Sequence, residues 1–206
     1  MTVRLVPLSL VLLWLGIGFG WRAWLQWRRY GGSGIMLFRS GRWMQHLREL
    51  GLVALSAMLI GQAAHFSFSP AVLERVALGS LAAAGVRFWS GVGLFAAGTV
   101  LMVVAQLDLG ASWRVGFDTR NRPGLVTDGL YGLVRNPIYL ALFVVLVGYL
   151  GMIPTWISLL LTIGTFVGIR VQVLDEEAFL TRTYGTAYRD YARRVGRFLP
   201  GVGCLV

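Results

Sequence analysis

Apolar residues run through this chain in long blocks that short polar segments separate. The first block extends from Leu5 to Trp27, and later blocks cover approximately residues 50–66, 88–107, 137–150 and 154–174. Because about 20 apolar residues suffice for a helix to cross a bilayer, the pattern predicts an all-α integral membrane protein with about five transmembrane helices. The 137–150 block is short for a crossing, so we expect it and its successor to be tilted or partly covered by protein.

The segments between the blocks carry their own patterns. Residues 35–50 mix apolar side chains with arginines, which is typical of a segment lying on the membrane surface, although a partner-binding helix is an alternative. Residues 70–87 suggest a loop or a short surface helix. From residue 180 to 195, apolar and aromatic positions recur at helical spacing, which predicts an interfacial amphipathic helix interrupted at Gly185. Its tyrosines, Tyr184, Tyr188 and Tyr191, are interpreted as interface anchors.

Two local signals refine the helices. Asn136 followed by Pro137 predicts a helix start, since Asn is a good N-cap and proline is tolerated at the first helical position. Small residues in the 88–107 block favour the close approach of a neighbouring helix; they are Gly91, Gly93, Ala96, Ala97 and Gly98.

Composition and charge support a membrane protein and set its orientation. Hydrophobic residues make up 56% of the chain and charged residues 14%, and all 19 basic residues are arginines. Fifteen arginines fall in segments 28–48, 108–136 and 170–206, against Arg4, Arg75 and Arg87 on the opposite side. The positive-inside rule therefore predicts a multi-pass protein with the N-terminus outside and the C-terminus cytoplasmic. The expected location is a bacterial inner membrane. Clustered basic arms with interleaved aromatic residues, as in nucleic-acid binders, are absent from the sequence, and its single cysteine, Cys204, excludes an intrachain disulfide.

The orientation brings two polar clusters to the same side of the membrane. In an antiparallel hairpin of the last two apolar blocks, Arg135, Asn136 and Tyr139 would lie beside Asp175, Glu176 and Glu177, lining one cytoplasmic pocket. The chemistry available there is limited, because the only histidines, His46 and His65, lie elsewhere and Ser112 has no neighbouring histidine. A metal site and a hydrolytic triad are therefore unsupported. A dinucleotide-binding loop is also unsupported, because no glycine-rich loop follows a strand pattern. Arginines, carboxylates and tyrosines suit a cationic or zwitterionic cofactor next to a lipid-soluble acceptor.

Four motifs in this region resemble the isoprenylcysteine carboxyl methyltransferase family, which includes prokaryotic membrane methyltransferases. They are Gly-Leu-Val-Thr-Asp-Gly-Leu-Tyr from Gly124, Arg-Asn-Pro-Ile-Tyr from Arg135, Glu-Glu-x-x-Leu from Glu176 and Tyr-Gly-x-x-Tyr-x-x-Tyr from Tyr184. The likeness covers about residues 108–201. It divides the chain into a transmembrane scaffold, residues 1–107, and a methyltransferase-like region, residues 108–206.

The resemblance implies S-adenosylmethionine as the methyl donor and assigns roles by position. The implied cofactor-binding residues are Pro123, Gly124, Leu125, Val126, Tyr131, Asn136, Pro137, Ile138 and Tyr139. Glu176, Glu177 and Arg135 are the implied catalytic residues, and Gln172 and Glu176 would contact the acceptor. Asn136 replaces a family histidine, and Gln172 stands where prenylcysteine-acting members place an arginine.

These departures leave the methyl acceptor open among a lipophilic or small carboxylate, thiol or amine. Two alternative functions also stay open on the residues alone. One is a membrane sterol-type reductase that uses a nicotinamide cofactor. The other is a non-catalytic membrane protein whose arginine-rich face binds anionic lipid or a partner. The sequence predicts bilayer lipid as a partner, predicts no nucleic acid, and does not reveal an oligomeric state.

Overall fold

The structure is a computed structural model that describes residues 2–39, 43–83, 85–116 and 124–204. Within these ranges the chain is helical, with isolated β-bridges and no strand. An N-terminal helical rod comprises the 3-10 turn η1 (Thr2–Leu5), α1 (Val6–Leu15), the π-helical η2 (Gly16–Trp21) and α2 (Arg22–Tyr30). The other long helices are α3 (Trp43–Phe68), α5 (Val86–Asp108), α6 (Pro137–Met152) and α7 (Trp156–Tyr184).

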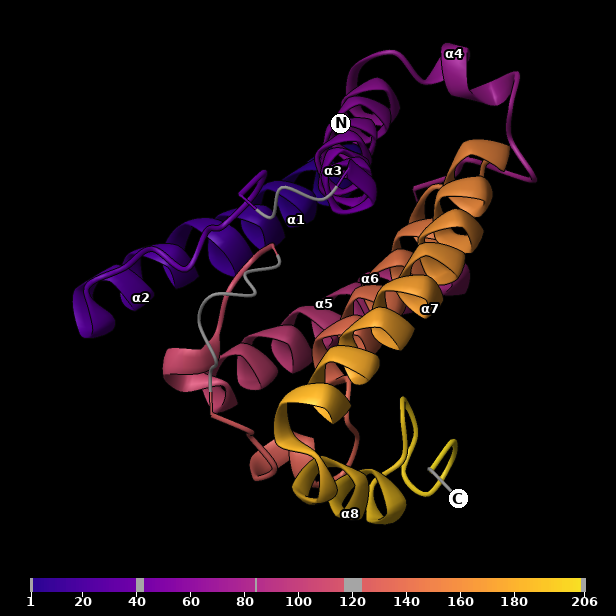
Figure 1. Ribbon diagram of the computed structural model, residues 1–206. Helices are drawn as coiled ribbons and strands as arrows, with labels where there is room; N and C mark the ends of the chain where they lie inside the picture. The colour runs from indigo at the N-terminus through magenta and orange to yellow at the C-terminus, as the bar shows by residue number, and fades with distance from the viewer. Residues whose placement is uncertain (1, 40–42, 84, 117–123, 205–206) are drawn as a thin grey trace.

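Four helical spans are long and apolar enough to cross a membrane, which confirms the predicted class for the described part of the chain. They cover Val3–Tyr30, Trp43–Phe68, Val86–Asp108 and Trp156–Tyr184, while α6 is a shorter apolar helix. Figure 1 shows α5, α6 and α7 packed together, with α1 and α3 forming a second group beside them. The short α4 (Pro70–Glu74) lies in the 70–87 segment, as the sequence suggested.

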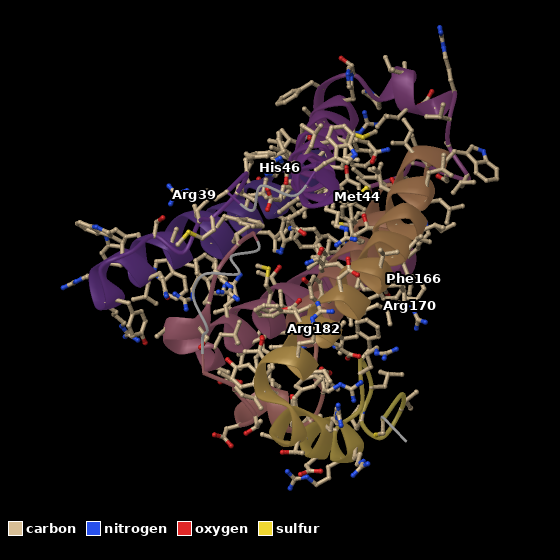
Figure 2. All side chains as sticks on the ribbon, in the orientation of Figure 1. Arg39, Met44, His46, Phe166, Arg170 and Arg182 are labelled. Atoms are coloured by element: carbon tan, nitrogen blue, oxygen red, sulfur yellow. The ribbon has the colours of Figure 1, made fainter. Side chains whose placement is uncertain are left out.

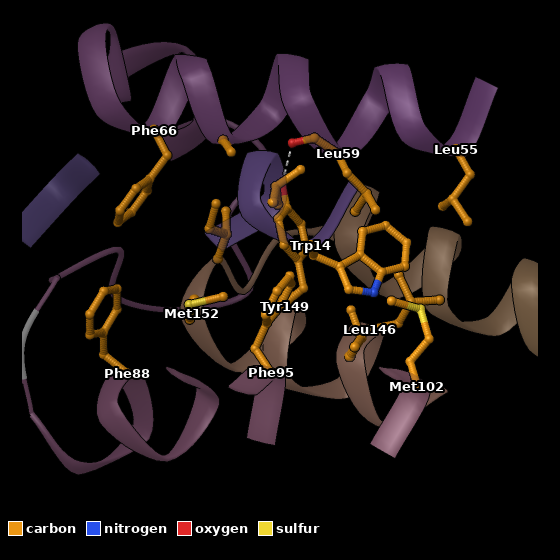
Figure 3. Close-up of a cluster of buried hydrophobic side chains, with 14 of the residues drawn as sticks. Trp14, Leu55, Leu59, Phe66, Phe88, Phe95, Met102, Leu146, Tyr149 and Met152 are labelled. Carbon is orange, nitrogen blue, oxygen red and sulfur yellow. Dashed lines mark hydrogen bonds between the residues drawn. The ribbon is translucent and has the colours of Figure 1, made fainter. Parts of the chain in front are cut away.

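A buried apolar core joins the two groups of helices (Figure 3). Trp14 of α1 contacts Phe95 of α5 edge to face, with their ring centroids 6.4 Å apart. Tyr149 of α6 is also buried, and its hydroxyl donates to the carbonyl of Leu59 in α3 at 3.0 Å (Figure 3). The hydrogen bond satisfies the phenol inside an apolar environment, where an unpaired hydroxyl is costly.

Glycines allow α5 and α6 to pack with their backbones in close approach. A Cβ added at Gly148 of α6 would lie 2.5 Å from the backbone nitrogen of Phe95, and one at Gly98 of α5 would lie 2.8 Å from that of Val145. The predicted small-residue interface is therefore confirmed at Gly91 and Gly98. Gly93 is different, because a Cβ there meets nothing within 4 Å.

Two of the predicted helix boundaries are wrong. The surface segment 35–50 does not exist as one unit, because α3 already begins at Trp43. Its polar residues Gln45 and Glu49 are buried, and the amide of Gln45 donates to Glu49 at 3.2 Å, so they face protein instead of the membrane surface. The last apolar helix also continues past residue 174 to Tyr184, which places the Asp175–Glu177 cluster within α7.

The C-terminal amphipathic helix is α8 (Thr186–Arg194), separated from α7 by Gly185 with φ 57°. Interpreting Tyr188 and Tyr191 as interface anchors was wrong, because these residues are only 1% and 4% exposed. Their rings contact each other edge to face and pack against protein. The aromatic side of α8 thus packs against protein, with Leu125, Leu180, Tyr184 and Val195 around it. Figure 1 shows α8 next to the C-terminal end of α7.

Candidate functional site

A cavity of about 640 Å³ lies between α3, α5, α6, α7 and α8. This volume is within the range of small-molecule sites. The sequence-predicted residues that line the cavity are Gly124, Leu125, Val126, Tyr131, Arg135, Asn136, Ile138, Tyr139, Gln172 and Glu176. The structure thus brings the two sequence-distant polar clusters to one chamber.

Tyr131 is held in the cavity by contacts on both sides of its turn, the 3-10 helix η4 (Gly129–Gly132). The carboxylate of Asp108, at the end of α5, accepts a hydrogen bond from the backbone N–H of Leu130 at 2.8 Å. The hydroxyl of Tyr191 donates to the carbonyl oxygen of Tyr131 at 2.7 Å. Gly129 has φ 59° and lies directly against Asp108, so a side chain at this position would be both strained and crowded.

The phenols on the polar side of the cavity stay protonated at neutral pH. Burial, reinforced by the negative charge of Glu176, raises the pKa of Tyr131. Burial likewise raises the pKa of Tyr188, and it raises the pKa of Tyr191 to about 12. These hydroxyls are therefore available as hydrogen-bond donors to a ligand or to neighbouring carbonyls.

The start of α6 places Asn136 and Tyr139 against α7. The helix begins at Pro137 as predicted, but the Asn136 side chain makes no capping hydrogen bond. Its amide instead donates to the carbonyl oxygen of Arg197 at 3.2 Å. One turn later, the hydroxyl of Tyr139 donates to the Glu176 carboxylate at 3.1 Å, which fixes that carboxylate at the cavity wall.

Arg135 and Glu177 form a buried ion-pair cluster with Arg197. The guanidinium of Arg135 lies 3.0 Å from Glu177, and Arg197 lies 2.8 Å from the other oxygen of the same carboxylate. Arg135 also donates to three carbonyl oxygens, those of Ala192, Val195 and Gly203. We infer that this cluster positions the C-terminal segment against the start of α6.

Two of the predicted residues that the structure describes do not line the cavity. Glu177 faces the ion-pair cluster, and Pro137 is buried at the base of α6 without lining the chamber. Pro123 falls outside the described residues. Glu176 and Glu177, adjacent in sequence, therefore have different surroundings.

Sequence reasoning missed several residues that line the cavity, namely Arg48, Gln106, Tyr188 and Arg114. The amide oxygen of Gln106 and the hydroxyl of Tyr188 are buried without a hydrogen-bond partner. Unsatisfied buried polar atoms are rare in native structures, and a ligand that pairs with them is one explanation. Tyr188 had a sequence signal, since it is the second tyrosine of the last motif, whereas Arg48 and Gln106 had none.

The chemical groups of the cavity favour a cationic or zwitterionic ligand at its polar end. Glu176 supplies a carboxylate, Tyr131 supplies an aromatic face, and Arg114 supplies positive charge. The described residues contain no cluster of histidine, cysteine and acidic side chains that would hold a metal ion. Towards the opposite end the walls become apolar, and they include Leu52, Leu55 and Leu160.

Comparisons with known proteins show which sequences and folds this chain is similar to. The family model for phospholipid methyltransferases matches residues 86–187. The protein-S-isoprenylcysteine O-methyltransferase of Schizosaccharomyces pombe is 29% identical over 114 residues, which are 54% of this chain and 48% of that protein. The chain thus aligns with about half the length of this relative.

The fold has a solved counterpart. The structure of a eukaryotic intramembrane Ras methyltransferase, an isoprenylcysteine carboxyl methyltransferase, superposes with a TM-score of 0.65 and 20% sequence identity. The match covers 96% of this chain and 66% of that one. The resemblance predicted from the motifs is confirmed: this multi-pass membrane protein is similar in sequence to an isoprenylcysteine O-methyltransferase and similar in fold to an intramembrane isoprenylcysteine carboxyl methyltransferase.

Proposed function

We propose that the protein is an S-adenosylmethionine-dependent methyltransferase that modifies a lipophilic or small acceptor at the cytoplasmic face of the membrane. The observation that carries the proposal is the meeting of Gly124–Val126, Tyr131 and Tyr139 with Glu176 in a single cavity. That cavity is polar at one end and apolar at the other, as a water-soluble donor and a lipid-soluble acceptor require.

The residues present fit the proposed cofactor. Its sulfonium and ammonium groups suit the carboxylate of Glu176 and the aromatic face of Tyr131. The unpartnered atoms of Gln106 and Tyr188 offer one acceptor and one hydroxyl for its polar groups. Arg114 also lines the cavity and suits a carboxylate. When bound, the cofactor supplies an electrophilic methyl group.

The protein's own contribution is to position the reactants and exclude water. Asp108 and Tyr191 hold Tyr131 at the wall, and Tyr139 holds Glu176, so that little reorganisation is needed on binding. A carboxylate or thiolate acceptor reacts without losing a proton. A neutral amine or thiol gives up a proton, and Glu176 is then the proton acceptor within the cavity.

The arginine distribution supports the cytoplasmic assignment. The polar ends of the helices, near residues 31–35, 108–116, 128–136 and 185–204, lie at one end of the molecule, joined by the bridges between Ile35 and Val115 and between Val134 and Gly196. They coincide with the arginine-rich segments. We assign this end to the cytoplasm, with the cofactor entering from water and the acceptor entering sideways from the bilayer.

Calorimetry on the full chain in detergent tests the proposal. S-adenosylhomocysteine is expected to bind saturably, and Glu176→Gln and Tyr131→Ala are each expected to weaken it about tenfold or more, because each loses a ligand contact. Glu74→Gln, an exposed carboxylate on α4, is the matched control and should leave affinity unchanged.

Three outcomes would count against the proposal. Unchanged affinity and turnover in both site variants would reject the site assignment. Binding of NADPH in place of S-adenosylhomocysteine would favour a reductase, and binding of neither would favour a non-catalytic lipid-binding protein. Isotope-labelled methionine, fed to cells with and without the protein, then identifies the acceptor by mass spectrometry of lipid and small-molecule extracts.

A further inference from the structure

Arg48 of α3 crosses the cavity to reach α7. Its guanidinium donates to the side-chain oxygen of Gln172 at 3.1 Å and to the carboxylate of Asp175 at 2.6 Å. Arg48 and Gln172 line the cavity, whereas Asp175 does not. The side chain of Arg48 is 24% exposed and that of Asp175 is 60% exposed. The ion pair therefore joins a cation on the cavity wall to an anion whose side chain is largely exposed.

The cavity next to Arg48 is shaped for an amphiphile. Away from the polar end, α3 contributes Leu52, Leu55 and Met58, while α7 contributes residues from Leu160 to Ile169. At 1.5 Å per residue, Leu160 and Gln172 are roughly 18 Å apart along α7, which is comparable to the hydrocarbon depth of one leaflet. A second contact between α3 and the start of α7 lies beyond the Leu160 end of this stretch, where the side chain of Gln62 hydrogen-bonds with those of Thr155 and Ser158.

The charges around Arg48 leave it suited to an incoming anion. Gln172 precedes Glu176 by one helical turn on the same side of α7, so Arg48 lies at the boundary between the apolar chamber and the cofactor end. Glu49, its neighbour on α3, is occupied by the backbone N–H of Phe38 and by Gln45. Arg135 is committed to Glu177 and three carbonyls.

Asp175, the exposed partner of Arg48, attracts the guanidinium less strongly than an anion inside the cavity would. An ion pair with a solvent-exposed carboxylate gains little, because water and salt screen it. An anionic group inside the cavity would meet the same guanidinium in a less polar environment, where the attraction is stronger. The planar fork of Arg48, already oriented by Gln172, suits a carboxylate or a phosphate.

We propose that Arg48 binds the anionic group of a lipid acceptor, a carboxylate or a phosphate, which displaces Asp175 while the lipid tail lies between α3 and α7. The inference rests on the proposed function for the subsequent methyl transfer, but the binding itself is separately measurable. It assigns Arg48 as the residue that selects charged over neutral acceptors.

Opposite effects of two substitutions test this inference. The probes are a farnesylated N-acetylcysteine, its neutral carboxamide and phosphatidylethanolamine, each titrated against the full chain in detergent by thermophoresis. Arg48→Gln should lower the affinity for whichever anionic probe binds wild type by about 10- to 100-fold, as expected for loss of a charge-assisted hydrogen bond. Asp175→Asn should raise the affinity for the same probe, because it removes the competing anion. Arg48→Lys, which keeps the positive charge, should retain part of the affinity that Arg48→Gln loses.

The controls separate recognition from a structural latch. Both substitutions break the same ion pair, so a merely structural role predicts that they shift affinity in the same direction, and that result would overturn the inference. Arg170→Gln, an exposed arginine on α7 labelled in Figure 2, should have no effect. The carboxamide should bind wild type and Arg48→Gln equally.

The remaining outcomes also decide the matter. Binding of the farnesylated acid identifies the carboxylate source, and binding of phosphatidylethanolamine identifies the phosphate source. If neither binds wild type, the inference is rejected. S-adenosylhomocysteine affinity is measured on the same samples. If wild type does not bind S-adenosylhomocysteine, the proposed function is contradicted. If Arg48→Gln binds both S-adenosylhomocysteine and the lipid probe as wild type does, only the role of Arg48 is contradicted.

Discussion

Tyr188 combines deep burial with an unsatisfied hydroxyl. The residue is 1% exposed, lines the cavity, and has no hydrogen-bond partner for its oxygen among the described residues. An unpaired buried hydroxyl costs free energy in the free protein, and a ligand that pairs with it recovers that cost. The side chain therefore favours the bound state over the free state.

Tyr188→Phe should show this balance as two opposite changes. We expect the thermal stability of the free protein to be unchanged or higher, by up to about 1–2 kcal/mol, because the substitution removes the unpaired group. S-adenosylhomocysteine affinity should fall about 3- to 10-fold, measured by calorimetry on the same preparation. A loss of stability without a loss of affinity would show that Tyr188 acts only in packing.

The sequence predicted which residues lie near one another only where those residues belong to a recognisable motif. Tyr131, Tyr139 and Glu176 were predicted together, because motif order and an antiparallel hairpin place them together, and the structure brings all three to the cavity. Arg48 was not, since its partner Gln172 is 124 residues away along the chain. Helical periodicity determines which residues share a face, but it does not tell which distant helix a long side chain reaches.

At the scale of elements, the packing of α5 against α6 depends on glycines that leave no Cβ atom between the two backbones. Gly98→Ala would place a Cβ 2.8 Å from the backbone nitrogen of Val145, which a backbone cannot accommodate without moving. We expect a loss of about 1–3 kcal/mol in unfolding free energy. Thermal unfolding in detergent checks this value.

Gly93→Ala on the same helix is the matched control. A Cβ there meets open space, so the substitution should be neutral or stabilising by up to about 1 kcal/mol through helix propensity. Equal losses in the two variants would mean that helix propensity, and not the approach of α6, determines the result.

The lengths of the apolar blocks predicted that the helices exist, but they did not predict where each helix ends. The start of α6 at Pro137 was predictable because proline marks a first helical turn. The extension of α7 to Tyr184 was not, because Asp175, Glu176 and Glu177 resemble a solvated segment until α3, α6 and the C-terminal segment supply their partners. Tertiary ion pairs and hydrogen bonds therefore determined the boundary that periodicity misplaced.

At the scale of the whole molecule, Arg135 and Glu177 connect the start of α6, α7, the end of α8 and the C-terminal segment. Removing one partner of a buried ion pair leaves a buried charge uncompensated, which is strongly destabilising. Glu177→Gln should therefore reduce hydrogen-exchange protection together in residues 128–136 and 186–204, while the amides of α5 and the membrane-embedded part of α6 stay protected. Exchange followed by mass spectrometry measures both regions at once.

Asp190→Asn provides the comparison, because its pair with Arg193 is exposed on both sides. Its exchange pattern should match wild type. Uniform loss of protection in Glu177→Gln, including α5, would contradict a separate unit.

On the proposed function, the ion-pair cluster would also control how the water-soluble cofactor enters the cavity and how its product leaves. Contacts of the η4 turn, α8 and the C-terminal segment converge on Arg135, Glu177 and Tyr191. A rare cooperative detachment of these segments would uncover the polar chamber while α5 and α6 stay packed through Gly98 and Gly148. Turnover in such a protein would be limited by a local unfolding equilibrium at the aqueous boundary, and mild denaturant below the global transition would accelerate product escape.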